Sequence, residues 1–248
     1  MSAPTFARDL ISMGSKTVTW GFRGQWRREE IVHHLVHHGI GSIPIIAIST
    51  AFAGLVVTQE IAFHMDHALH TTTMIPGFTG QFIMRELGIA VPALLIVSKV
   101  GASMTAEIGG MKVTEQIDAL KLLGIDPVGY LVFPRFIAGI IASVSLTLIA
   151  LAVTLACAIL MAVSKFNFSW LEYINNLRHF VGLKDLACAL VKALAYGAVT
   201  PLIACTYGFR CQGGAQGVGS ATTDSVVSAT IAVILLDFVL TYLFTLIA

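Results

Sequence analysis

The sequence predicts an all-α integral membrane protein with about five transmembrane helices, an N-terminal interfacial helical segment and one charged helix between two spans. The composition supports this fold class, because 56% of the residues are hydrophobic and 12% are charged, about half the charged fraction of soluble domains. Long uncharged runs recur along the 248 residues, and each transmembrane helix needs about 20 residues. Nucleic-acid binding is not expected, since the formal net charge is +1 and no basic tail is present.

Residues 1–38 are predicted to form an N-terminal interfacial amphipathic segment. Basic residues alternate there with large aromatic ones, including Trp20 and Trp26. This pattern favours helices at the anionic cytoplasmic surface of a membrane over a disordered basic tail. A secretory signal peptide is not expected, because Arg8 and Asp9 interrupt the segment and no cleavage site follows an apolar run.

The rest of the chain, residues 39–248, is predicted to be a membrane domain of five spans. The spans cover about 40–62, 81–106, 133–163, 185–208 and 225–247. The connection 63–80 has no lysine or arginine, which the positive-inside rule expects of a non-cytoplasmic loop. Aromatic residues in 165–184 indicate an outer interfacial helix, and the glycine-rich stretch 208–224 is predicted to be a cytoplasmic loop. Five spans then leave the N-terminus cytoplasmic and the C-terminus on the outer side.

A charged segment, 109–127, separates the second and third predicted spans. Apolar residues recur in it at three- and four-residue spacing: Val113, Ile117, Leu120 and Leu123. This spacing indicates an amphipathic helix over about 112–125, which Gly124 would help to end. Its position between two spans makes it a candidate lever for a partner outside the membrane.

Ionisable residues also fall inside or at the edge of the predicted spans: Lys99, Glu107, Lys192 and Asp237. Arg85 and Glu86 lie near the outer end of the second span, and Gln59 with Glu60 closes the first. A charge at mid-bilayer costs roughly 2.5–3.5 kcal/mol on insertion scales, so these groups must face protein, water or a head group. Ion pairing within the bundle and a functional role are both open. An arginine such as Arg85 also suits the phosphate of a lipid head group.

The histidines form two groups near the first span. The first group is His33, His34, His37 and His38, and the second is His64, His67 and His70, with Asp66. The first group contains two pairs spaced by four residues, which would allow a zinc or copper site. No HExxH motif and no cysteine at ligand spacing accompanies them, so we predict no metal site.

Motifs for catalysis and nucleotide binding are missing from the sequence. GSKT at 14–17 lacks the order of a phosphate-binding loop, and no GxSxG sequence is present. The four cysteines form no CxxC pair, so we expect them to pack as small hydrophobic residues. We therefore predict no catalytic residue and no cofactor in this chain.

Three motifs resemble those of the MlaE-type (YrbE, Ttg-type) permease subunits of lipid-handling ABC transporters. They are RELG at 85–88, KVGASMTAEIGGMKVTEQIDALKLLGIDP at 99–127 followed by FPR at 133–135, and GVGSATTDSVVSATIAVILLDFVLTYLF at 217–244. The resemblance covers the chain from about residue 39 to its end. Lys99 departs from the family pattern, which commonly has arginine there, and Ile89 replaces the proline that commonly follows RELG.

The resemblance implies a homodimer of five-span permease subunits in the bacterial inner membrane, driven by a cytoplasmic ATPase that binds ATP and magnesium. Helix 112–125 would be the coupling helix that docks on this ATPase, through Lys112, Glu115, Gln116, Asp118, Lys121 and Asp126. An MCE-domain protein on the outer side, and often a STAS-domain protein, are further implied partners. The implied cargo is phospholipid moving between inner and outer membranes, with Arg85, Glu86, Gln59 and Glu60 as candidate lipid-binding residues.

Two other functions remain open from the residues alone. A secondary transporter or channel would use Glu107, Lys192 and Asp237 as a charge relay, although no internal repeat is evident. An intramembrane metalloenzyme would use the histidines and would contain stoichiometric metal.

Overall fold

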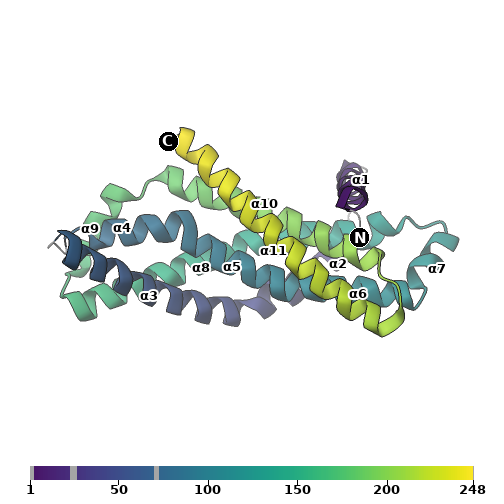
Figure 1. The fold of residues 1–248 in the computed structure, drawn as a ribbon, viewed down its shortest axis with the longest axis horizontal. Coiled ribbons are helices and arrows are strands. Elements are labelled where there is room, and N and C mark those ends of the chain that lie inside the picture. Colours follow the sequence, from purple (N-terminus) through teal and green to yellow (C-terminus); the bar gives the residue numbers. More distant parts are fainter. Residues whose placement is uncertain (1–2, 23–26, 70–72, 248) are drawn as a thin grey trace. The chain divides into compact units, whose positions relative to one another are not determined.

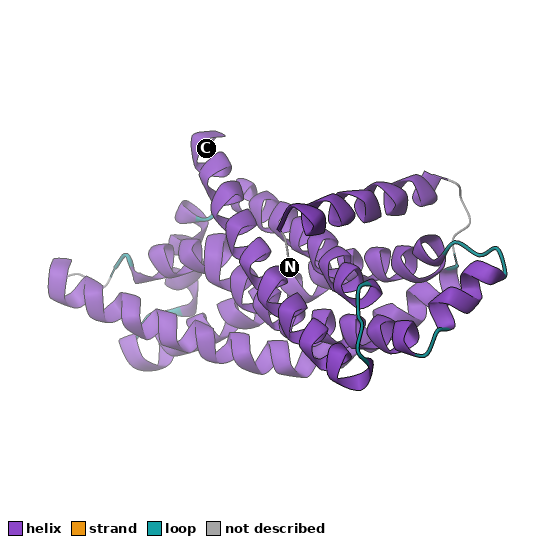
Figure 2. Ribbon diagram, turned by 45° about the vertical axis from the view of Figure 1, so that its right-hand side comes forward, coloured by secondary structure: helices purple, strands orange, loops and turns teal. Residues whose placement is uncertain are grey.

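A computed structural model describes residues 3–22, 27–69 and 73–247, whose helices are labelled in Figure 1. Helices account for nearly all of these described residues, and none of them forms a strand (Figure 2). This confirms the all-α fold class. Trp26 and His70, which the sequence predictions include, lie outside the described residues.

Five helical segments of the described chain are long and apolar enough to cross a membrane, which confirms the predicted number of spans. They are Arg28–His67, Ile75–Val113, Val128–Phe166, Leu183–Phe209 and Gly214–Leu246. With 27 to 40 residues, each exceeds the roughly 20 residues that cross the hydrocarbon layer. The segments are therefore longer than the predicted spans.

The first two segments contain irregular turns. The first consists of α2 (Arg28–His34), the π-helical turn η1 (Leu35–Gly39), the 3-10 turn η2 (Ile40–Ser42) and α3 (Ile43–Leu69). The second consists of α4 (Ile75–Phe82), the π-helical turn η3 (Ile83–Leu87), α5 (Gly88–Ile96), the π-helical turn η4 (Val97–Gly101) and α6 (Ala102–Val113).

The other elements are simpler. The π-helical turn η5 (Val128–Val132) leads into α8 (Phe133–Phe166), and α10 (Leu183–Phe209) and α11 (Gly214–Ile247) are the last two long helices. Three helices lie outside these segments: α1 (Ala3–Phe22), α7 (Gln116–Leu122) and α9 (Trp170–Phe180).

The chain forms two compact units, and each of the five segments contributes residues to both. The first unit contains Met1–Ser42, Leu94–Ser143 and Leu194–Leu236. The second unit contains Ile43–Ala93, Val144–Ala193 and Asp237–Ala248. The first unit therefore includes α1 and α7, and the second includes α4 and α9.

The first unit has an apolar core beneath α7. Its buried members are Ile108, Ile117, Leu131, Val132 and Cys205. Nearby, the Thr105 hydroxyl lies 3.1 Å from the carbonyl oxygen of Ala204 and 2.8 Å from the Ser225 hydroxyl, so a buried polar group also joins α6, α10 and α11. Ile117 is fully buried, which anchors the short helix α7 to this core.

The second unit has its own core, in which α4 and α9 pack closely. Its buried members are Ala62, Ile75, Ile159, Ala162, Phe168 and Tyr173. A Cβ atom on Gly77 would overlap the ring of Phe180. Glycine at position 77 therefore allows the close approach of α4 to α9, in the region where the sequence predicts an interfacial helix.

The helix predicted over about 112–125 is divided in the structure. Val113 ends α6, and α7 begins only at Gln116. Between them Glu115 has a φ of 59°, in the left-handed region, which a continuous right-handed helix excludes. The separate course of α7 therefore depends on this turn, whereas Gly124, with a φ of 75°, follows the end of the helix as expected.

The glycine-rich stretch 208–224, predicted to be a loop, is mostly helical. Only Gly213 and Gly214 have positive φ values, of 91° and 68°, and α11 begins at Gly214. The loop prediction is wrong because α10 continues to Phe209 and α11 begins at Gly214. Gly208 serves helix packing, since a Cβ there would lie 2.7 Å from the Cβ of Ile108. Small residues that allow helices to approach are common in membrane bundles.

Candidate functional site

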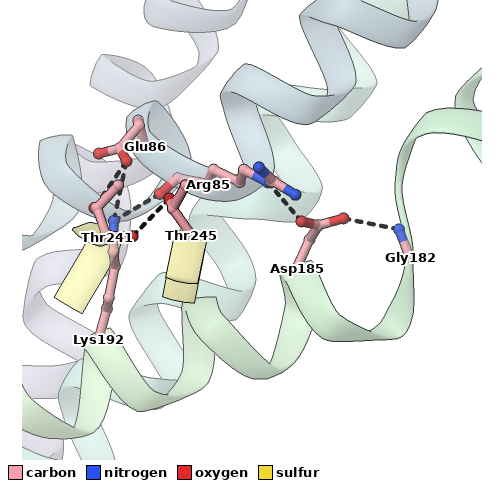
Figure 3. A network of polar contacts seen from close by, with 7 residues as sticks. All are labelled: Arg85, Glu86, Gly182, Asp185, Lys192, Thr241 and Thr245. Carbon is pink, nitrogen blue, oxygen red and sulfur yellow. Dashed lines mark hydrogen bonds and ion pairs between the residues drawn. The ribbon is translucent and has the colours of Figure 1, made fainter. Parts of the chain in front are cut away.

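Lys192 on α10 is the centre of a buried polar network in the second unit, and its side chain has no exposed surface. Its Nζ atom donates to the backbone carbonyl of Arg85 at 2.8 Å and to Oε1 of Glu86 at 3.2 Å (Figure 3). Oδ1 of Asp237, on α11, lies 2.8 Å from the same nitrogen. An ammonium group has three N–H donors, so these three partners match its capacity.

Arg85 has a second, separate partner. Its Nε donates to Oδ1 of Asp185 at 2.6 Å, and Oδ2 of Asp185 accepts from the backbone N–H of Gly182 at 2.9 Å (Figure 3). The Asp185 side chain is 7% exposed, whereas that of Arg85 is 41% exposed. A buried carboxylate thus holds a guanidinium that remains accessible, and a guanidinium has four further N–H donors.

The helical irregularity η3 carries Arg85 and Glu86. Pro92 follows within α5 and has no N–H, so the carbonyl of Gly88 loses its usual α-helical donor. Gly88 also packs tightly, since a Cβ there would overlap the Leu151 side chain. π-Helical turns of this kind recur at functional sites because they reorient side chains and backbone carbonyls. Here the Arg85 carbonyl receives the buried Lys192 ammonium.

A cavity of about 420 Å³ lies over this network within the second unit. It is lined by Arg85, Glu86, Gly182, Lys184, Asp185, Ala187, Cys188, Lys192, Thr241, Phe244 and Thr245. Thr241 also donates to Oε1 of Glu86 at 3.0 Å (Figure 3). Charged groups of both signs and apolar side chains share this surface, and its volume is in the ordinary range for small-ligand sites.

The other predicted lipid-binding residues lie elsewhere in the second unit. Oε1 of Gln59 accepts from Lys165 at 2.6 Å, and Glu60 lies 3.3 Å from His64. Neither belongs to the lining of this cavity. The structure therefore brings Arg85, Glu86, Lys192 and Asp237 together, but Gln59 and Glu60 have other neighbours.

Two residues of the site did not emerge from the sequence, Asp185 and Thr241. Asp185 lies in the first turn of α10, where the sequence shows only a carboxylate near the start of a span. Thr241 is a small polar residue in an apolar helix, which is common without a site. Only the structure shows that they contact Arg85 and Glu86.

The two remaining predicted intramembrane charges, Lys99 and Glu107, are in the first unit. Lys99 donates to the backbone carbonyl of Gly41. Glu107 accepts from Nη2 of Arg135 at 3.1 Å and from the Ser103 hydroxyl at 3.1 Å. Glu107 therefore forms an ion pair, whereas the partner of Lys99 is a backbone carbonyl.

Three of the predicted coupling residues, Gln116, Asp118 and Lys121, lie on α7, whose buried anchor is Ile117. Lys112 lies on α6, and Glu115 and Asp126 lie before and after α7. Asp118 accepts hydrogen bonds of 2.8 Å from Lys112 and from Lys121. These bonds, first that from Lys112, lower the pKa of the Asp118 carboxyl to about 2. Glu115, Gln116 and Lys121 are exposed.

Exposed leucines extend the surface of α7. Leu122 is 90% exposed and Leu123 75% exposed, which is unusual for large apolar side chains on a short charged helix. Asp126 has a different environment, because it accepts from Nε1 of Trp20 at 2.9 Å and from the backbone N–H of Val128 at 3.1 Å. Asp126 therefore connects α1 to the turn before η5.

Comparison of this chain with known proteins finds a match to one family. The family model described as Permease MlaE matches residues 31–243, which include both the polar network and α7. The chain belongs to the MlaE permease family. A probable ABC transporter permease protein of Rickettsia felis is 35% identical over 219 residues, covering 86% of this chain and 82% of the relative.

Relatives of this MlaE-family chain occur in other lineages as well. A probable ABC transporter permease protein of Synechocystis is 34% identical over 221 residues, covering 89% of this chain and 84% of the relative. The chloroplastic protein TRIGALACTOSYLDIACYLGLYCEROL 1 of Arabidopsis thaliana is 30% identical over 219 residues, covering 88% of this chain and 62% of the relative. The MlaE-family chain is thus a multi-pass membrane permease of the ABC transporter type, which implies an ATPase partner.

Proposed function

We propose that this permease moves phospholipid between the inner and outer membranes of a bacterium, using ATP hydrolysed by a partner subunit. The observation that carries the proposal is the cavity over the Lys192 network, with the accessible Arg85 guanidinium in its wall. The name of the Arabidopsis relative contains a glycerolipid, which agrees with a lipid cargo.

The cavity has the chemistry that a phospholipid head group requires. Arg85 offers N–H donors to a phosphate, and its bond to Asp185 fixes the position of the guanidinium. Glu86 and Asp185 supply negative charge for a cationic head group such as an amine. Phe244 and Ala187 line the same cavity and suit the apolar part of the lipid. We therefore assign Arg85 and Glu86 to head-group binding, and not Gln59 and Glu60.

Helix α7 is the proposed docking site for the ATPase. Its exposed leucines, Leu122 and Leu123, offer apolar area that a protein partner would bury, and the charges around Asp118 would orient that partner. The core contact of Ile117 connects α7 to α6 and α10, so movement of α7 would be transmitted to the membrane helices. This arrangement suits a coupling helix that passes the nucleotide state of the ATPase to the permease.

The distribution of basic residues supports a cytoplasmic position for the N-terminus and α7. Outside the candidate spans, Arg178 is the only lysine or arginine among the described residues of the second unit. The corresponding residues of the first unit are Arg8, Lys16, Arg27, Lys121 and Arg210. By the positive-inside rule, this difference favours a cytoplasmic position for α1 and α7. The C-terminus would lie on the outer side of the inner membrane.

The proposed assembly contains two copies of this chain, the ATPase, an MCE-domain protein on the outer side and, in some systems, a STAS-domain protein. The exposure of the first and last spans supports self-association. Only 22% and 11% of their most apolar stretches are buried within the chain, against 50% for the second and fourth spans. Large apolar residues, such as Phe52 and Phe238, are exposed on them. These faces are available for lipid, for a second copy, or for both.

The competing charge-relay transporter receives less support. Glu107 pairs with Arg135, whereas Lys192 pairs with Glu86 and Asp237 in the other unit. Each of these three charged residues therefore has an ion-pair partner.

The test is mild-detergent purification of the complex from its native host, with mass spectrometry of the proteins and lipids. We expect an ATPase and phospholipid to copurify with the wild type, and Leu122→Asp to remove the ATPase while leaving the lipid. Leu171→Asp, on the exposed surface of α9, is the matched control. Lipid transfer that continues without the ATPase and follows a proton gradient would overturn the proposal.

A further inference from the structure

A cluster of side chains that can bind a metal ion lies in the first unit, outside the cavity of the second unit and outside α7. His34 and His38 come from α2 and η1, and Glu107 comes from α6. One ligand atom from each residue lies within 4.8 Å of those of the other two. The two histidines are four residues apart in the sequence, which puts them on the same side of the helix. Their rings stack in parallel, with centroids 5.6 Å apart.

The two histidines are buried, unlike their sequence neighbours. His34 is 6% exposed and His38 3% exposed, whereas His33 and His37 face outward. Among the described residues, Nε2 of His38 has no hydrogen-bond partner. A buried polar atom without a partner is rare, because it loses its contacts with water and gains none in return. A bound cation would give this nitrogen the partner that it lacks.

We propose that His34, His38 and Glu107 bind a divalent transition-metal ion, with zinc as the reference ion. Two imidazoles and one carboxylate are a donor set that zinc accepts, with a further position open to water. Ligand atoms less than 4.8 Å apart can converge on one ion, since zinc–nitrogen and zinc–oxygen bonds are about 2.0–2.2 Å long. Bonds of this length separate the ligand atoms of a tetrahedral site by about 3.4 Å, so the side chains would move together by roughly 1 Å to bind the ion.

Glu107 keeps the capacity to bind an ion despite its hydrogen bonds. Its Oε1 accepts from Ser103 and its Oε2 from Arg135, both at 3.1 Å. A carboxylate has about four lone-pair directions, so each oxygen retains one for a metal. Arg135 also donates to the backbone carbonyl of Leu131 at 2.8 Å, which fixes the guanidinium and, through it, the carboxylate. Such outer contacts orient the ligands of known metal sites.

The positive charge of the nearby Arg135 influences which metal ions the site can bind. Its positive charge opposes every cation, so an ion held mainly by charge, such as magnesium or calcium, gains little from a single carboxylate here. Zinc, nickel and copper bind imidazole nitrogen strongly, and this part of the binding energy persists beside a positive group. The site therefore favours these ions over magnesium and calcium.

A cavity of about 520 Å³ in the first unit gives the ion a route and room for water ligands. His34 and Glu107 line it, together with Glu30, His33 and His37. The bound ion would join the start of the first span to α6, the helix that ends at the turn before α7. Metal binding would thus stabilise the contact between these two segments.

The experiment uses full-length protein without a polyhistidine tag, purified in detergent, loaded with zinc and dialysed. We expect one zinc ion per chain by inductively coupled plasma mass spectrometry. His38→Gln and Glu107→Gln should each weaken the zinc affinity at least tenfold. The double variant His64→Gln, His67→Gln, which removes exposed histidines of the second unit, should bind as the wild type does.

Thermal unfolding provides a second readout, because an ion that binds only the folded state raises the melting temperature. Zinc should raise it in the wild type and in the His64→Gln, His67→Gln control, but not in His38→Gln. If the variants fail to fold, X-ray absorption spectroscopy of the zinc-loaded wild type tests the site instead. We expect its spectrum to show two imidazole ligands on the zinc ion.

Three results would overturn the proposal. One is wild-type protein that retains no stoichiometric zinc, and another is a zinc spectrum with oxygen ligands alone. The third is zinc binding that survives His38→Gln but disappears in His33→Gln, His37→Gln, because the exposed pair would then be the site.

Discussion

The ammonium of Lys192 lies 2.8 Å from the carboxylate of Asp237, and Glu86 approaches the same nitrogen at 3.2 Å. One buried cation thus joins the π-helical turn η3, α10 and α11 within the second unit. Because the cation has two carboxylates and one carbonyl as partners, its removal leaves negative groups without compensation.

Lys192→Ala should therefore destabilise the protein strongly. Removing one partner of a buried ion pair typically costs about 3–5 kcal/mol. Thermal unfolding in detergent should show a clear decrease in melting temperature, and less protein should reach the membrane. Lys165→Ala is the control, because this exposed lysine contacts only Gln59 among the hydrogen-bond partners described, and its loss should change stability by less than about 0.5 kcal/mol. Equal melting temperatures for the two variants would contradict the role of Lys192.

Arg85→Ala should reduce the phospholipid that copurifies with the protein. A hydrogen bond to a charged group contributes about 1.5–3 kcal/mol, which corresponds to a loss of affinity of roughly tenfold or more. Lipid mass spectrometry per mole of protein provides the measurement. Arg178→Ala on α9 is the matched control, since this arginine is exposed and lies outside the cavity lining. Equal lipid in both variants would exclude Arg85 from head-group binding.

The double variant Glu115→Lys, Asp118→Lys should uncouple transport from ATP hydrolysis. It replaces two negative side chains, Asp118 on α7 and Glu115 just before it, by positive ones near Lys112 and Lys121, so a partner of complementary charge would be repelled. We expect normal membrane insertion, loss of ATP-dependent lipid transfer in proteoliposomes, and weaker ATPase binding. Glu172→Lys, on the exposed surface of α9, should leave all three unchanged. Normal ATPase binding and transfer in the double variant would exclude α7 as the docking helix.

The ion pairs of Asp118 predict how α7 responds to pH. Because Lys112 and Lys121 lower the pKa of this carboxyl from 3.8 to about 2, its contribution to the stability of α7 is complete above about pH 4. It is lost as the pH falls through about 2. Lys112→Met should raise the measured pKa of Asp118 toward 3.8, and NMR titration of the labelled carboxyl checks this. A pKa that is unchanged by Lys112→Met would show that the bond does not form in solution.

Two glycine substitutions should have opposite effects on stability. A Cβ on Gly54 of α3 would lie 2.5 Å from the carbonyl oxygen of Thr154 on α8, so Gly54→Ala should cost about 1–3 kcal/mol through overpacking. A Cβ on Gly219 of α11 would meet open space, so Gly219→Ala should stabilise its helix by about 0.5–1 kcal/mol. Thermal unfolding of both variants compares the two effects, and destabilisation by both would show that α11 needs glycine there for another reason.

Residues with strong local patterns were predictable. The apolar runs showed five spans, because helices in a membrane must satisfy their backbone groups internally and need an apolar surface. The spacing around Ile117 indicated an amphipathic helix, and Ile117 is indeed its buried residue. The left-handed turn at Glu115 was not predictable, since glutamate has no preference for that conformation and tertiary contacts must stabilise it.

The sequence by itself determined the helical membrane fold, the number of spans and the family, and it singled out Arg85 and Glu86 as candidate site residues. These follow from composition, periodicity and contiguous motifs, which are local properties of the chain. Only the tertiary structure decided that Asp185 holds Arg85, that Lys192 joins Glu86 to Asp237, and that Glu107 faces His34 and His38. The physical reason is that these partners are separated by tens to more than a hundred residues, so only helix packing brings their charges within bonding distance.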